Sequence, residues 1–195
     1  MKATFSLKHV SRITDDIGII EHCTFAKPNR KEGYCVDDNA RALLTCLRVD
    51  GKEKETAQQL IPTYLRFLVR ACDKKGFYQD LNSDLTWKDD ASVEDGFGRA
   101  MVALGETTLS APQDNQKFTA AFIFDQQAFL IPTIKYPRVM AQTIIAISKR
   151  IKFKKELIVL SDKLTKDYQK HSSESWRWYE DILTYENGRL PLSLF

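Results

Sequence analysis

The chain has 195 residues, 43% of them hydrophobic, and a formal net charge of +3. This length and apolar content allow one domain with a substantial core, and the small charge, spread along the chain, gives no reason to expect nucleic-acid binding. No stretch reaches the roughly 18 uncharged residues of a membrane span, and the N-terminus lacks a signal-peptide core, so we expect a soluble, cytoplasmic protein that binds neither nucleic acid nor membrane.

Residues 40–90 predict two helices followed by a connection. The segment 40–47 is apolar nearly all round, which is typical of a helix covered on several sides. Over 53–72, apolar side chains recur at three- and four-residue steps, so an amphipathic surface helix is predicted. Pro62 is expected to kink or restart this helix. Residues 76–90 open with glycine and carry Asn-Ser-Asp between apolar side chains, which predicts a loop or a short β-hairpin.

Residues 99–170 continue the helical pattern. The segments 99–105 and 139–147 are again apolar nearly all round and predict inner helices. Residues 154–170 place apolar side chains against a Lys/Glu/Asp face, which predicts a second surface helix. The segment 116–131 is strongly apolar and helical, and its pattern leaves open whether it is an inner or an outer helix.

Cysteine and histidine spacing gives no indication of a metal or a cofactor. The four cysteines form no C-x-x-C pair, and the three histidines show no metal-ligand spacing. The glycine-rich loop that would cradle a nucleotide phosphate is also missing from the sequence. We therefore expect reduced cysteines, no metal site and no cofactor.

A loose repeat marks the starts of the expected inner helices. Acidic or amide residues and an arginine recur in "DNARALL", "EDGFGRAMVAL", "YPRVMAQ" and "ENGRLPL", around Arg41, Arg99, Arg138 and Arg189. The intervals of about 40 to 60 residues match two helices and two connections, so we expect a run of helical hairpins. Each cluster alone can also be a helix cap with its arginine counter-ion. Inner helices that lie side by side would gather these ends.

Several segments resemble one family of helical proteins. They are "SRITDDIGIIEHC" (11–23), "PNRKEGYCVDDNARALL" (28–44), "SVEDGFGRAMVALGE" (92–106), "YPRVMAQ" (136–142) and "WYEDILTYENGRLPLSLF" (178–195). Together they resemble the six-hairpin, glycosidase-like proteins of the (α/α)6-toroid class, in the group found fused to glycosyltransferases or near mannoside phosphorylases. The resemblance implies an all-α fold and a carbohydrate ligand.

The resemblance also implies an incomplete array. The chain would be a single partial toroid domain over 1–195, with about four of the six hairpins. It departs from the group's S-E-D-S-H-G-R motif by carrying Phe97 at the histidine position. A fragment of a longer product, a decayed paralogue and half of a two-chain toroid remain three open explanations. A homodimer, or a partner chain that covers the C-terminal hairpin, is the expected association.

The resemblance implies that the carboxylates at the inner-helix ends are the candidate catalytic groups. Glycoside hydrolysis needs one carboxyl that donates a proton and another that is ionised. The candidates are Asp38, Glu94, Asp95 and Glu186. Asp38 precedes Arg41 by three residues, which favours an ionised base or a hydroxyl-binding group. Glu94 or Asp95, near the apolar Phe97, is the candidate acid.

Neighbouring polar and aromatic side chains are the candidate substrate contacts. Amides donate and accept hydrogen bonds to hydroxyl groups, arginines orient carboxylates, and flat rings cover the apolar face of a sugar. The candidates are Tyr34, Asp37, Asn39, Arg41, Trp87, Arg99, Asn187 and Arg189. We expect Asp38, Asp95 and Asn187 at one common end of an arc of inner helices, with 53–72 and 154–170 outside it.

Two functions follow from these expectations. One is a glycosidase-like protein that hydrolyses or binds glycosides through the carboxylates. The other is a non-catalytic module that keeps the fold and binds sugar or another protein. The sequence does not indicate the sugar or the linkage.

Overall fold

The computed structural model describes residues 5–195, and that part of the chain is mostly helical. Its α-helices are α1 (Lys8–Arg12), α2 (Val36–Arg48), α3 (Lys54–Ala71), α4 (Asp95–Ser110), α5 (Asp114–Ala128), α6 (Pro137–Ile147), α7 (Lys154–His171) and α8 (Arg189–Leu192). Short 3₁₀ turns at Gly51–Glu53, Ile131–Thr133 and Ile151–Phe153 precede α3, α6 and α7. The six predicted helical segments correspond to α2 through α7, so the helical prediction is confirmed.

Three short antiparallel ribbons connect the helices. β1 (Cys23–Thr24) pairs with β2 (Lys27–Pro28), and β4 (Cys72–Asp73) pairs with β5 (Gly76–Phe77). β3 (Tyr34–Cys35) pairs with β6 (Asp80–Leu81), which joins two segments far apart in the chain. Residues 76–90 were predicted as a loop or short hairpin, and the chain folds back there through an antiparallel bridge between Leu81 and Trp87. The same strand, β6, also pairs with β3 immediately before α2.

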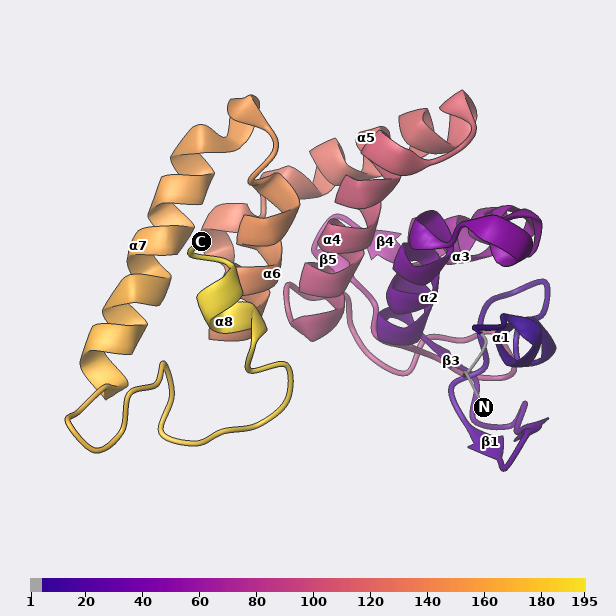
Figure 1. Ribbon diagram of the computed structural model, residues 1–195, viewed down its shortest axis with the longest axis horizontal. Coiled ribbons are helices and arrows are strands. Elements are labelled where there is room, and N and C mark those ends of the chain that lie inside the picture. Colours follow the sequence, from indigo (N-terminus) through magenta and orange to yellow (C-terminus); the bar gives the residue numbers. More distant parts are fainter. Residues whose placement is uncertain (1–4) are drawn as a thin grey trace.

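The helices form pairs around a row of inner helices. α2, α4 and α6 lie side by side, and α8 packs against α6 (Figure 1). α3 packs against α2, α5 against α4, and α7 against α6, so each inner helix is followed in the chain by a partner on its flank. Because every second helix belongs to the row, the inner helices run in the same direction. Their N-terminal ends therefore lie on one side of the molecule.

Burial follows the predicted division between inner and surface helices. Nearly every residue of α6 and the middle of α4 is buried, whereas α7 buries only Leu160 and Leu164. α3 is continuous through Pro62, so the predicted restart at this residue was wrong. The buried stripe of α3, which includes Ile61 and Leu65, packs on both sides of the proline and holds the helix together there.

The helix α5, whose class the sequence left open, is a flanking helix. It packs against α4 and also touches α3. Phe118, Phe122 and Phe129 are all more than 60% exposed, while Ile123 and Phe124 are buried. This mixture of buried and exposed apolar side chains explains why the sequence shows no clear polar face. No helix within residues 5–195 has both the length and the apolar character needed to cross a membrane.

Candidate functional site

Arg99 joins carboxylates from three parts of the chain at the N-terminal side of the inner helices. Its Nε lies 2.7 Å from Asp37 Oδ1 on α2, and its Nη1 lies 2.8 Å from Glu186 Oε1. Asp95, one turn earlier on α4, lies 3.5 Å from Nη2. The Arg99 side chain is only 7% exposed. Asp37, Asp95 and Glu186 therefore share one arginine, whereas Asp38 pairs with Arg41 within its own helix.

Helix geometry explains why these carboxylates gather here. Asp37 lies in the first turn of α2 and Asp95 in the first turn of α4. A carboxylate in the first turn is stabilised by the partial positive charge of the unpaired backbone N–H groups. The α2 cap is unusual, since the Sγ of Cys35 accepts the Asp38 N–H at 3.4 Å. This leaves both aspartates free to contact side chains.

The cluster is not fully satisfied by hydrogen bonds. Asp37 Oδ1 and Arg99 Nε are close but poorly aligned, so both atoms lack a hydrogen-bond partner within residues 5–195. Asp95 Oδ1, Gln142 Oε1 and Glu180 Oε2 are also buried and unpaired there. Buried polar atoms without partners are rare in folded proteins and call for an explanation. Several of them together at one end of a helix row indicate a place that receives polar groups.

Burial also changes the acidity of Asp37. Desolvation raises the pKa of this carboxyl from 3.8 to about 6, although Arg99 and Arg41 act in the opposite direction. The folded state therefore holds the Asp37 proton more tightly than the unfolded chain does. A carboxyl with such a pKa changes its charge within the range where acid–base catalysts operate.

This shift predicts a pH dependence of stability. Between about pH 4 and pH 6, the unfolded chain releases the Asp37 proton before the folded state does, so the wild type loses stability as the pH rises. Asp37→Asn removes the titrating carboxyl and with it this loss of stability. The variant should therefore become more stable relative to the wild type as the pH rises across the same interval. Thermal unfolding at pH 4 and pH 7 measures the difference, with Asp38→Asn as the matched control. A difference between Asp37→Asn and wild type that does not change with pH would contradict the prediction.

A second arginine, Arg138 on α6, holds the segment before α8. Its Nη1 lies 2.6 Å from Glu180 Oε1, its Nε donates to the Tyr185 carbonyl at 2.7 Å, and its Nη2 donates to Asn187 Oδ1 at 3.1 Å. The guanidinium also lies 4.8 Å from the centre of the Tyr185 ring. These contacts fix an irregular segment against the start of α6. They thereby bring Glu180 and Tyr185 to the acidic cluster.

Glu186 is held from two sides in an uncommon backbone conformation. Its carboxylate accepts hydrogen bonds from Arg99 Nη1 at 2.8 Å and from Gln142 Nε2 at 2.7 Å. Its φ of 50° lies in the left-handed region that non-glycine residues rarely adopt. Such backbone strain often occurs at functional sites, where the surrounding contacts maintain it.

Two cavities meet beside this cluster. One, of about 270 Å³, is lined by Glu94, Asp95, Tyr136, Pro137, Arg138, Val139, Glu180 and Tyr185. The other, of about 280 Å³, is lined by Phe77, Gln79, Asp89, Asp90, Ser92, Glu94, Asp95 and Gly96. Glu94 and Asp95 belong to both, so they lie at the junction. Tyr136 and Tyr185 are each 52% exposed and offer ring surface to the first cavity.

A larger hollow lies elsewhere. It has a volume of about 830 Å³ and is lined partly by α2, with Arg41 and Arg189 among its residues. Asp37, Asp95 and Glu186 do not line it. Asp95 lines both smaller cavities and lies next to Arg99, so we place the candidate site at those two cavities.

Three residues predicted to contact substrate line neither cavity, two of them because they are buried in the core and Trp87 because it packs, half-buried, against the core. Tyr34 is buried and its hydroxyl donates to Asp15 at 2.8 Å. Asn39 is completely buried, with its amide bonded to the Ile19 N–H and the Cys35 carbonyl. Trp87 stacks on Tyr78, with 4.9 Å between ring centres. We therefore exclude Tyr34, Asn39 and Trp87 from the candidate ligand contacts.

Other predicted residues lie at the edge of the cluster. Asp38 pairs with Arg41 at 2.6 Å and faces a hollow beside Val10 and Ile19. The α2 carboxylate that reaches Arg99 is thus Asp37, although Asp38 was the predicted base. Asn187 uses its amide to bind Arg138 and the Thr184 carbonyl. Arg189 lines the larger hollow.

The sequence pattern did not single out Glu180, Tyr136 or Gln142. Glu180 and Tyr136 line the first cavity, and Gln142 binds Glu186. Glu180 and Tyr136 fall within the segments 178–195 and 136–142 that carry the family resemblance, which was the available signal. Gln142 interrupts the otherwise apolar "VMAQTIIAI", and a buried amide in an inner helix indicates a polar partner.

The fold and the site together define a protein of paired helices with an arginine-bridged carboxylate cluster at one end of its inner row. No protein-family model, curated protein or solved structure matches the chain. The chemistry of the site therefore has to be inferred from its own residues.

Proposed function

We propose that the chain is a glycosidase-like, carbohydrate-processing protein. The observation that carries this proposal is the junction of the two cavities at Glu94 and Asp95. Each cavity is slightly smaller than a typical site for a drug-sized ligand, which suits a single sugar ring. Two rings in adjoining cavities would place the glycosidic bond over the shared carboxylates.

The lining of each cavity supports a sugar ligand. In the first, the half-exposed rings of Tyr136 and Tyr185 can cover the apolar face of a sugar. In the second, Gln79, Asp89 and Ser92 supply groups that hydrogen-bond to hydroxyls. An apolar platform on one side and polar groups on the other match the two kinds of surface that a sugar presents.

Glu94 and Glu180 are the proposed catalytic carboxyls. Glu94 lines both cavities and is the proposed donor of the proton that the leaving oxygen needs. Its Oε1 accepts a hydrogen bond from the Tyr136 hydroxyl at 3.3 Å. Glu180 also lines the first cavity, and its Oε1 lies 2.6 Å from Arg138 Nη1. Glu180 would then activate water or attack the sugar carbon.

In the proposal, the two catalytic carboxyls are accompanied by three further carboxylates, those of Asp95, Asp37 and Glu186. Arg99 contacts all three, and of them only Asp95 lines the cavities. Asp37, Glu186 and Arg99 would therefore hold Asp95 in position without contacting the sugar. The helix pairs would correspond to the first hairpins of an (α/α)-toroid-like array, with α8 in the position of a fourth inner helix. In this proposal Asp37 takes the position at the cluster that the sequence assigned to Asp38.

The alternative is a non-catalytic sugar-binding module. The buried contacts of Arg99 favour this possibility, because a network that connects α2, α4 and the segment before α8 also stabilises the fold. Release of the aglycone from a panel of chromogenic glycosides tests the two functions. Release by the wild type supports the enzyme, and binding without release supports the module. If the chain neither binds nor cleaves any sugar, the proposal fails.

A further inference from the structure

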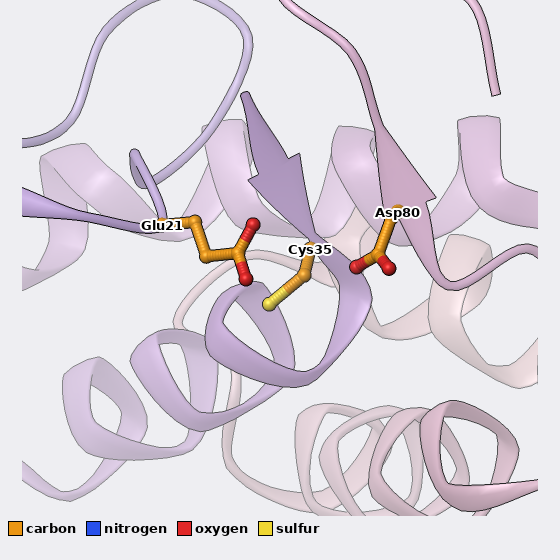
Figure 2. A group of neighbouring side chains, drawn as sticks. All are labelled: Glu21, Cys35 and Asp80. Carbon is orange, nitrogen blue, oxygen red and sulfur yellow. The ribbon is translucent and has the colours of Figure 1, made fainter. Parts of the chain in front are cut away.

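A second group of reactive side chains lies apart from the Arg99 cluster. One oxygen each from Glu21 and Asp80 and the Sγ of Cys35 all lie within 4.8 Å of one another. Figure 2 shows Cys35 between the two carboxylates, with its sulfur pointing towards Glu21. The proposed sugar site uses none of these three residues.

Strand pairing brings the three side chains together. Cys35 on β3 is directly opposite Asp80 on β6. On the other side of β3, Ile20 pairs with Tyr34, and the Glu21 N–H donates to the Gly33 carbonyl at 3.1 Å. Alternation along paired strands then places Glu21 on the same face as Cys35, at a diagonal position that a long side chain can reach. The cluster is thus built by the register of three segments.

These groups lack the partners that usually neutralise them. Within residues 5–195, the carboxylates of Glu21 and Asp80 accept no hydrogen bond and contact no lysine or arginine. The basic side chain beside Glu21 is that of His22, whose Nε2 lies 3.5 Å from Glu21 Oε1.

Cys35 is 5% exposed and accepts one long hydrogen bond from the Asp38 N–H. Its Sγ lies within 4.8 Å of one oxygen each of Glu21 and Asp80. A thiol and two carboxylates gathered at one point, with neither carboxylate in an ion pair with lysine or arginine within residues 5–195, form a donor set that a metal ion can use.

We propose that Glu21, Cys35 and Asp80 form a binding site for Zn²⁺. A thiolate together with carboxylates suits zinc, since magnesium and calcium prefer oxygen ligands alone. Binding forms a Zn–S bond, breaks the S–H bond of Cys35 and releases that proton to solvent. Water or the neighbouring His22 completes the four ligands that zinc prefers. The site differs from the sequence expectation of no metal because its ligands come from segments far apart in the chain.

A metal here would also affect the start of α2. Cys35 is the residue that caps α2, two residues before Asp37. Zinc would link this cap to β6 and to the segment that carries Glu21. The proposed ion therefore stabilises the N-terminal end of the first inner helix, independently of whether a sugar binds.

Metal titration of the chelator-treated full chain tests the proposal. We expect one Zn²⁺ per chain, a higher thermal midpoint with zinc, and a sulfur-to-cobalt charge-transfer band when Co²⁺ replaces zinc. Cys35→Ser should lower the zinc affinity at least 100-fold and abolish the cobalt band. Cys23→Ser, the matched control, should keep both because Cys23 is not in the cluster.

A further variant keeps the test decisive if Cys35→Ser weakens the α2 cap and fails to fold. Asp80→Asn keeps the side-chain size and should lower the zinc affinity at least tenfold, with an unchanged circular dichroism spectrum. The proposal is overturned if the folded wild type binds no stoichiometric zinc. It is also overturned if folded Cys35→Ser or Asp80→Asn binds zinc as tightly as the wild type.

Discussion

Replacing Glu94 by glutamine is expected to lower glycoside hydrolysis by about 100-fold or more, because an amide cannot donate the proton that a general acid supplies. Glu94→Gln should still bind sugar, since the amide keeps the shape of the side chain and its capacity for hydrogen bonding. Glu180→Gln should show a comparable loss, because the ionised carboxylate paired with Arg138 disappears.

Steady-state hydrolysis of any glycoside that the wild type cleaves is the measurement. Glu174→Gln serves as the matched control, because Glu174 is exposed and does not line either cavity. Its turnover should equal that of the wild type. If Glu94→Gln retains wild-type turnover, Glu94 is not the proton donor.

The second large effect is expected at Gly33, in the ribbon that leads into α2. Gly33 has a φ of 82°, and a Cβ atom there would lie 2.1 Å from the Leu81 carbonyl oxygen. Gly33→Ala therefore has to adopt an unfavourable backbone conformation and also separate β3 from β6. We expect a loss of about 3 kcal/mol in the free energy of unfolding, which corresponds to roughly 10 °C in the thermal midpoint.

Gly51→Ala separates these two contributions. Gly51 also has a positive φ, 63°, but a Cβ atom there would meet nothing within 4 Å. Because no atom of residues 5–195 lies within 4 Å of that Cβ position, this variant should lose only about 1 kcal/mol, the cost of the backbone conformation alone. Denaturant unfolding of both variants measures the difference. Equal losses would show that the β3–β6 ribbon tolerates a side chain at Gly33.

The helices could be predicted because the pattern that specifies each of them lies within one short stretch of sequence. Apolar side chains at three- and four-residue steps define α3 and α7, and runs that are apolar on all sides define α4 and α6. The identity of the site carboxylates is harder to predict. Asp37 and Asp38 are neighbours in sequence but point about 100° apart on a helix. The packing of α2 against α4 decides that Asp37 reaches Arg99.

Long-range and irregular features could not be predicted from the pattern. Glu180 lies in the segment between α7 and α8, which has no periodicity and is held by Arg138. The Glu21, Cys35 and Asp80 cluster depends on the pairing of β3 with β6, two short strands on opposite sides of α2 and α3 in the chain. Trp87 stacks on Tyr78 and lines neither cavity, which the sequence could not indicate because aromatic rings near acidic residues suit a sugar site and a core equally well.

The expected association through the C-terminal hairpin stays a prediction. Leu190 is buried, whereas Leu192 is more than half exposed and Phe195 fully exposed. Analytical ultracentrifugation would compare the wild type with a variant that carries polar residues at these two exposed positions.

Chemical-shift mapping of the ¹⁵N-labelled wild type with a panel of neutral disaccharides tests the central claim most directly. The two-cavity site predicts that at least one disaccharide shifts the amide signals of Gln79 and Gly96 in one cavity and of Val139 and Tyr185 in the other. Shifts on both sides of Glu94 and Asp95 would place one sugar ring in each cavity. Shifts confined to the larger hollow around Leu44 and Val49, or no shifts with any disaccharide, would contradict it.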